Sequence, residues 1–117
     1  MKYTIESVGP VAILVTRGPW TGGTWTTEFH EEIKRRIDEG TRDVLLDFEH
    51  SSAASSAGVG VLVAVRASVL NAGGRLGLVN VTPRIMRSLV VSGIKQLFDY
   101  YESREEALQA LGAAETA

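Results

Sequence analysis

The sequence predicts a single α/β domain with a mixed, mostly parallel sheet of about five strands and about four helices. Short runs of β-branched and aliphatic residues alternate with longer segments whose apolar residues recur every third or fourth position. The 117 residues are 44% hydrophobic, show no internal repeat or linker, and are enough to bury one core. Strands that alternate with helices form parallel sheets with right-handed crossovers. The domain is expected to cover residues 1–111, with a frayed tail of small and polar residues at 112–117.

The first third of the chain predicts a hairpin and a helix. Two runs rich in β-branched residues, Lys2–Ser7 and Val11–Arg17, flank Gly9-Pro10 and indicate antiparallel strands. A turn follows at Gly18–Gly23, and a helix is expected from about Thr24 to Glu39, where Gly40 ends it. The helix has one apolar stripe at every fourth residue, made of Trp25, Phe29, Ile33 and Ile37.

The middle of the chain predicts a buried strand, a loop of small residues and a second helix. The strand covers Asp43–Phe48, the loop follows it, and the helix runs from about Ser56 to Asn71, where Gly73-Gly74 stops it. The expected inner face of this helix consists of Val59, Leu62, Val63, Val69 and Leu70.

The last third predicts two further strand–helix units. The strands are Arg75–Val81 and, shorter, Leu97–Tyr101. Thr82-Pro83 strongly indicates the start of a helix, because Thr is a favoured N-cap residue and Pro suits the first helical position. A capping box at Ser103–Glu106 begins the final helix. The third helix is expected to face inward through Ile85, Met86, Leu89 and Val90.

Ligands and partners of such sheets usually engage loops that follow the carboxyl ends of strands. The qualifying loops are Gly18–Gly23, Glu49–Ala57 and Asn80–Pro83. The second is the most unusual, because Ser55 and Ser56 directly precede a helix. A helix N-terminus has unpaired N–H groups and favours anions, and a phosphate on serine adds about −1.5 to −2 charge. A plain N-cap, worth about 1 kcal/mol, is the alternative interpretation of either serine.

Other residues of this region carry open alternatives. Gly58 and Gly60 leave the first helical turn without bulk, so a partner can approach closely. Trp20, in the predicted glycine-rich turn, is either an interface anchor or a cover for the sheet edge. Arg84 and Arg87 project from the third helix, either as plain surface charges or as contacts to an acidic partner.

Composition and spacing argue against several functions. A formal net charge of −2 argues against a nucleic-acid binder. The longest nearly apolar stretch, Ala57–Val65, is too short to cross a bilayer, so a cytoplasmic location without membrane contact is expected. There is no cysteine, and His30 and His50 lack further ligands in a metal-binding pattern. No nucleophile elbow or dinucleotide fingerprint is present, so we expect neither catalysis nor a metal or cofactor.

The segment from Leu46-Asp47-Phe48 to Ser56-Ala57-Gly58-Val59-Gly60-Val61-Leu62 resembles the signature of STAS domains. Further similarity is found at Ala72–Leu76, Val81–Arg84, Ser92–Ile94, Leu97-Phe98 and Ser103–Leu108. The resemblance implies a STAS-like fold and a role like that of anti-sigma factor antagonists, which bind an anti-sigma factor or serine kinase and release the sigma factor.

The resemblance also implies a phosphoacceptor, which falls on Ser56. The implied partner-binding residues are Trp20, Thr21, Ser55, Ser56, Ala57, Gly58, Val59 and Gly60. Two acidic residues of the family's interface are missing, because Ser55 replaces the acid before the phosphoacceptor and Gly18-Pro19-Trp20-Thr21 contains none. The resemblance therefore also accommodates a different anti-sigma protein, or binding without a switch.

Three other functions remain as alternatives. The first is a STAS scaffold that is never phosphorylated, and the second is a small-ligand module for a nucleotide or lipid. The third, a hydrolase using Ser55 or Ser56 with His30 or His50, is the least favoured. The sequence leaves the oligomeric state open, including a homodimer.

Overall fold

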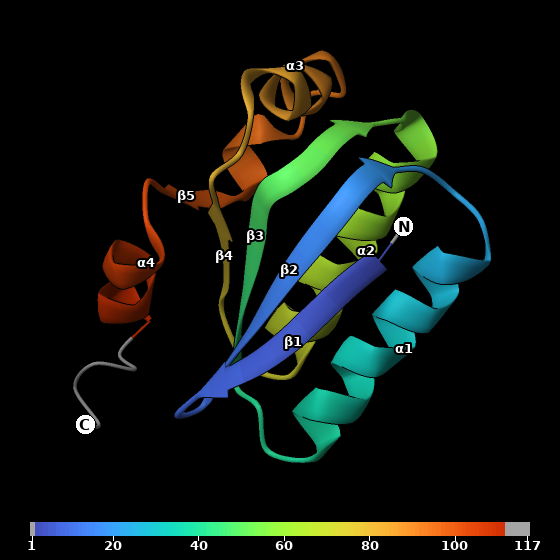
Figure 1. Ribbon diagram of the computed structural model, residues 1–117. Coiled ribbons are helices and arrows are strands. Elements are labelled where there is room, and N and C mark those ends of the chain that lie inside the picture. The colour runs from blue at the N-terminus through green and yellow to red at the C-terminus, as the bar shows by residue number, and fades with distance from the viewer. Residues whose placement is uncertain (1, 112–117) are drawn as a thin grey trace.

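The computed structural model describes residues 2–111 and contains one five-stranded sheet in the order β1-β2-β3-β4-β5 (Figure 1). The strands are β1 (Lys2–Val8), β2 (Val11–Trp20), β3 (Asp43–Ala54), β4 (Leu76–Val79) and β5 (Asp99–Tyr101). The β1–β2 pair is antiparallel and the other three pairs are parallel, which confirms the predicted mixed, mostly parallel sheet. The predicted frayed tail, 112–117, lies outside the described residues.

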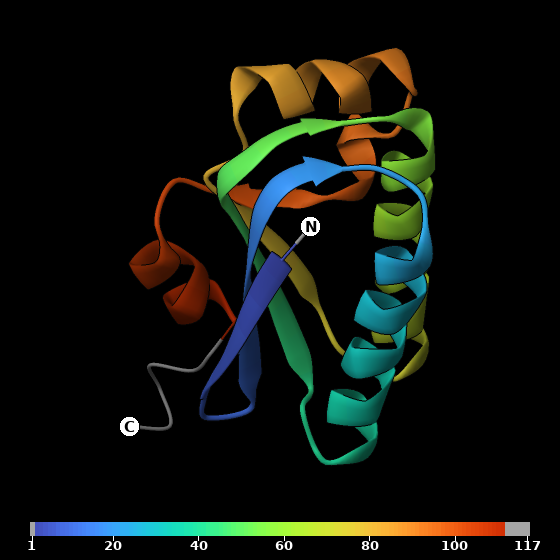
Figure 2. The ribbon, with the colours of Figure 1, turned by 45° about the vertical axis from the view of Figure 1, so that its right-hand side comes forward.

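Four α-helices connect or follow the strands. They are α1 (Thr24–Asp38), α2 (Ser56–Asn71), α3 (Pro83–Val91) and α4 (Arg104–Ala110), with a 3₁₀ turn η1 (Lys95–Leu97) before β5. Figures 1 and 2 show α1 and α2 on one face of the sheet and α4 on the other. In the same views α3 lies across the end of the molecule where β3 runs into α2.

The core has two layers, because successive side chains of a strand point to opposite faces of the sheet. On the face under α1 and α2, Leu14 and Leu46 pack in the same cluster as Phe29 and Leu62. The opposite face has a smaller cluster, in which the strands meet α4. Its buried members are Val11, Ile13, Leu45, Val79, Ala107 and Leu111.

Strands β2 and β3 are longer than predicted. Both were expected to end before the segments rich in Gly, Pro and Ser, yet β2 continues to Trp20 and β3 to Ala54. The two extensions pair in parallel through Gly18 with Ser51 and Trp20 with Ala54. Register shifts between Val15 and Arg17 and between Gly18 and Trp20 absorb the irregular residues. Pairing between strands therefore outweighs the local preference of these residues for turns.

Two predicted inner faces need correction. Leu70 of α2 is 43% exposed and Val90 of α3 is 54% exposed, although both were expected to point inward. In α2 the inner face instead includes Val65, which is fully buried. Because α2 is apolar over most of its circumference, the periodicity of its sequence does not identify the face that packs on the sheet.

Candidate partner-binding site at the start of helix α2

The junction between β3 and α2 is organised by Ser55. Its backbone is extended, and its Oγ accepts a hydrogen bond from the Gly58 N–H at 3.2 Å, so the predicted N-cap is confirmed for this serine. The Ser55 N–H donates to the Trp20 carbonyl oxygen at 2.8 Å. The start of α2 is thereby fastened to the end of β2, a segment 35 residues earlier in the chain.

Ser56 is the first residue of α2, and its side chain is exposed. Ser55, Ala57 and Gly60 are exposed beside it, and the first turn of α2 contains no acidic residue. Because the first N–H groups of a helix lack intrahelical acceptors and carry partial positive charge, this turn is suited to an anionic group.

The segment after β2 packs directly on the first turn of α2. A Cβ atom added at Gly58 would lie 2.0 Å from the Trp20 carbonyl oxygen, and one added at Gly22 would lie 2.9 Å from the Ala57 Cβ. Thr21, between them, is exposed. The structure therefore brings together the two segments that the sequence singled out. Of the two glycines in the first turn of α2, Gly58 permits close contact inside the molecule, whereas a Cβ added at Gly60 would face open space.

Trp20 does not lie in a loop, and its predicted place on the interface is wrong. It is the last residue of β2, its side chain is 1% exposed, and its ring packs edge-on against Phe29. Gly58 and Val59 are also buried. Because these three residues are buried, they support the exposed surface from beneath and are not part of it. The exposed part of the predicted set is Thr21, Ser55, Ser56, Ala57 and Gly60.

Two buried hydroxyl groups beneath this surface were missed by sequence reasoning. The Ser51 Oγ donates to the Thr16 carbonyl oxygen at 3.0 Å and lies 2.5 Å from the Thr16 Oγ1. The Thr16 Oγ1 accepts a hydrogen bond from the Trp20 Nε1 at 3.0 Å. These bonds satisfy the polar groups buried between the extended ends of β2 and β3. No sequence signal marks them, because Thr and Ser equally suit an exposed strand or a loop.

Helix α3 flanks the site. The Thr82 Oγ1 accepts from the Ile85 N–H at 3.3 Å, which confirms the predicted cap. The Ser88 Oγ donates to the Ala54 carbonyl oxygen at 3.0 Å and holds α3 against the last residue of β3. Arg84 and Arg87 are exposed and form no ion pair with any residue in the range 2–111.

Neither histidine pairs with the serines of the site. The His30 Nε2 lies 2.7 Å from the Ser68 Oγ of α2, and burial, followed by the charge of Lys34, lowers the pKa of His30. His50 lies on β3 beside Glu49. Within residues 2–111, no three acidic or histidine side chains are grouped to hold a metal ion. No helix in that range has the length and apolar character needed to cross a membrane.

The fold and this helix start define a class of domain, and a family model confirms it. The model for the STAS domain matches residues 2–107, so the chain belongs to the STAS domain family. The chain is 27% identical over 114 residues to BtrV of Bordetella bronchiseptica, a protein whose name assigns it as an anti-sigma factor antagonist. That match covers 97% of each chain.

Solved structures share the fold at lower sequence identity. An assigned anti-sigma factor antagonist from Thermotoga maritima superposes with a TM-score of 0.83 at 19% identity, covering 93% of each chain. The anti-sigma factor antagonist SpoIIAA in its unphosphorylated form superposes with a TM-score of 0.79 at 19% identity, and the match covers 95% of this chain and 97% of that one. Phosphorylated Bacillus SpoIIAA superposes with a TM-score of 0.72 at 20% identity, and the match covers 93% of this chain and 98% of that one.

Proposed function

We propose that this chain is a regulatory binding protein of the anti-sigma factor antagonist type and has no catalytic activity of its own. It binds an anti-sigma factor in the cytoplasm through the exposed residues at the start of α2 and the loop beside it. The observation that carries this proposal is the arrangement of Thr21, Ser55, Ser56, Ala57 and Gly60 on one exposed surface of small side chains. The match to BtrV over nearly the full length of both chains supports it.

We further propose that phosphorylation of Ser56 switches this binding off. Ser55 is engaged as the N-cap, whereas the Ser56 side chain is exposed at the first helical position. A phosphate there adds about −1.5 to −2 charge within reach of the first backbone N–H groups, so it is tolerated by the helix. The same charge, placed in the middle of a contact surface of small uncharged side chains, opposes partner binding because it must be desolvated.

The first experiment measures binding. Each anti-sigma factor encoded in the same genome is purified and titrated against this chain by isothermal titration calorimetry. At least one is expected to bind with a Kd of about 1 μM or tighter, as specific regulatory complexes do. Ser56→Ala is expected to keep that affinity, and Ser56→Asp to weaken it at least about tenfold. Ser7→Asp, at an exposed position of β1, is the matched control and leaves the affinity unchanged.

The outcomes separate the two parts of the proposal. If no anti-sigma factor binds, the partner class is wrong. If one binds and Ser56→Asp binds as tightly as the wild type, the chain is an unswitched scaffold. A second measurement tests the modification directly: incubation with ATP and the anti-sigma factor that binds is expected to add one phosphate, mapped by mass spectrometry to Ser56. Transfer to another serine would refute the assignment of Ser56.

A further inference from the structure

Charge is segregated along this chain. The chain contains fourteen acidic residues and has a formal net charge of −2, yet no Asp or Glu occurs between His50 and Phe98. The charged residues of that segment are all basic: Arg66, Arg75, Arg84, Arg87 and Lys95. The segment contains the end of β3, all of α2, β4 and α3, so it builds the candidate site apart from Thr21, together with its α3 flank.

Two of these cations are engaged inside the molecule. The Arg66 Nε donates to the Leu97 carbonyl oxygen at 2.8 Å, and the Arg75 side chain contacts Asp43 and the Ala110 carbonyl oxygen. Arg84 and Arg87 of α3 instead extend into solvent, without an acidic partner in residues 2–111. Two guanidinium groups therefore remain available beside the candidate site.

The same helix exposes apolar surface. Within residues 2–111, the large apolar side chains that are exposed are Val8, Leu70, Val90 and Val91. Two of these are neighbours on α3, and Val91 is 81% exposed. Residues 84, 87 and 91 are spaced three and four apart, so they share one face of the helix. The opposite face, with Ile85 and Leu89, is buried.

The position of α3 connects this face to the start of α2. The Ser88–Ala54 hydrogen bond places α3 against the residue that precedes Ser55. Figures 1 and 2 show α3 at the same end of the molecule as the start of α2. The two arginines and two valines are thus a lateral extension of the surface proposed above, and a partner on that surface can reach them.

We propose that the outer face of α3, formed by Arg84, Arg87, Val90 and Val91, contacts a protein surface in which carboxylate groups flank an apolar side chain. This inference rests on the proposed function, because the occupant to which it commits is the anti-sigma factor. Charge complementarity carries the choice, since guanidinium groups pair with carboxylates in a bidentate geometry and no acid of residues 50–98 competes for them. The valines favour a protein over a nucleic acid, whose backbone offers them no apolar contact.

Charge reversal tests the inference by calorimetry against the anti-sigma factor that binds the wild type. Arg84→Glu/Arg87→Glu is expected to weaken binding about a hundredfold, because like charges then face each other across the interface. The matched control, Arg17→Glu/Lys34→Glu, alters the net charge equally at exposed positions on β2 and α1 and leaves the Kd within about twofold. Glu→Arg substitution of the facing partner carboxylates should restore binding to the reversed variant. Equal affinities of the two double variants would overturn the proposal.

A second experiment tests the α3 surface independently of whether the proposed function is right. If no anti-sigma factor binds, a synthetic peptide of alternating Glu and Leu is titrated into the ¹⁵N-labelled chain. Shifts centred on Val90 and Val91 that vanish in Arg84→Glu/Arg87→Glu support the inference even though the partner class has failed. Absence of such shifts overturns it. Binding to a short DNA duplex or to anionic phosphatidylglycerol vesicles through Arg84 and Arg87, and not to the peptide, also overturns it.

Discussion

The first half of β3 and its far end use charge in opposite ways. On the face under α4, Asp43 and Asp47 are buried and each pairs with an arginine. At the far end of the same strand, the junction with α2 is held by hydroxyl groups, a glycine contact and an aromatic ring. Arg84 and Arg87 beside it form no ion pair within residues 2–111. In the first arrangement the charged groups pair with each other and stabilise the fold. In the second, charged groups and hydroxyl groups remain available to a partner.

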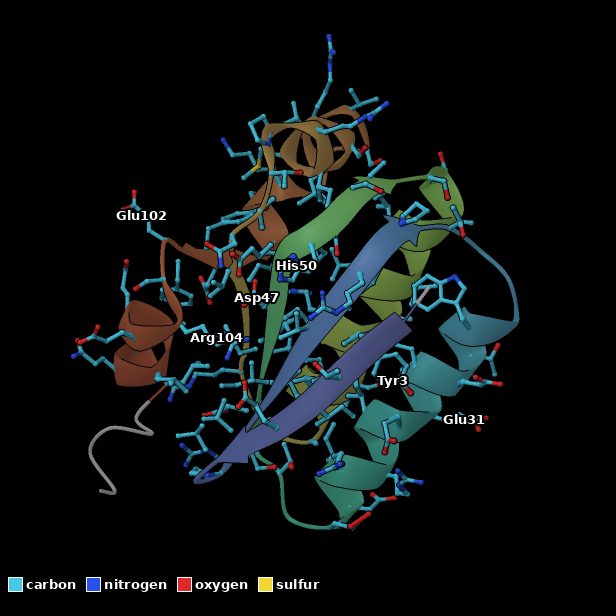
Figure 3. All side chains as sticks on the ribbon, viewed as in Figure 1. Tyr3, Glu31, Asp47, His50, Glu102 and Arg104 are labelled. Atoms are coloured by element: carbon cyan, nitrogen blue, oxygen red, sulfur yellow. The ribbon has the colours of Figure 1, made fainter. Side chains whose placement is uncertain are left out.

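The paired face fastens helix α4 at both ends. The Arg104 Nε donates to the Asp47 Oδ2 at 3.0 Å, and Arg104 also pairs with Glu6 of β1. Figure 3 shows Arg104 directed from α4 toward Asp47 on the sheet. At the other end of α4, the Arg75 Nη1 donates to the Ala110 carbonyl oxygen at 3.1 Å while the Arg75 N–H donates to the Asp43 Oδ1 at 2.9 Å. A seven-residue helix, too short to be stable alone, is thereby held on the sheet.

The largest effect on stability is expected at Gly58, where the backbone of α2 contacts the backbone of β2. In Gly58→Val the new Cβ would lie 2.0 Å from the Trp20 carbonyl oxygen, so β2 and α2 must separate. We expect a loss of about 3 kcal/mol or more in the free energy of unfolding, measured by urea titration. Gly60→Ala is the control, because it faces open space inside a helix and should stabilise the protein by up to about 1 kcal/mol. Equal stability of the two variants would contradict the close contact.

The next effect tests the paired face. Asp47→Ala removes the acceptor of bonds from Arg104, Asn80 and the Glu49 N–H. We expect a loss of about 3 kcal/mol, since donors beside a buried site are left unpaired. Amide hydrogen exchange should accelerate in α4 more than in α2. If the exchange of α4 is unchanged, Arg104 does not hold this helix.

The paired face also predicts an acid dependence of stability. Burial alone would raise the pKa of Asp47, but hydrogen bonds from the Glu49 N–H, Asn80 and Arg104, together with the charge of Arg104, outweigh burial and lower it below its ordinary value of 3.8. The resulting stabilisation is fully present above pH 3.8 and is lost as the pH falls through the lower folded-state pKa. Urea titrations at a series of acidic pH values should therefore show a steeper loss for the wild type than for Asp47→Asn. Parallel curves would refute this role.

The smallest effect distinguishes the two serines. Ser55→Ala removes the acceptor for the Gly58 N–H and is expected to cost about 1 kcal/mol, as loss of an N-cap does. Ser56→Ala, at the exposed first helical position, should change stability by less than about 0.5 kcal/mol. Thermal unfolding of both variants measures the difference. A larger loss of stability in Ser56→Ala would mean that the Ser56 hydroxyl supports the fold and is not free to contact a partner.

Much of the candidate site could be predicted from local sequence because its parts are local. Ser55 precedes a helix at capping distance from Gly58, and Thr82-Pro83 begins the next helix, as their short-range hydrogen bonds require. The burial of Trp20 could not be predicted in this way. Its flanking Gly18 and Pro19 are typical of a turn, and only pairing with β3 draws them into a strand.

The sequence by itself determined the order of the elements, the helix caps and the segregation of charge, because these depend on neighbouring residues or on composition alone. Only the tertiary structure decided which side of α2 is buried, that Trp20 lies beneath the site, and that Arg104 reaches Asp47 across 57 positions of the chain. Such contacts depend on how strands align and how helices settle on a sheet. The free energy of that packing is shared among residues far apart in sequence, so no local pattern encodes it.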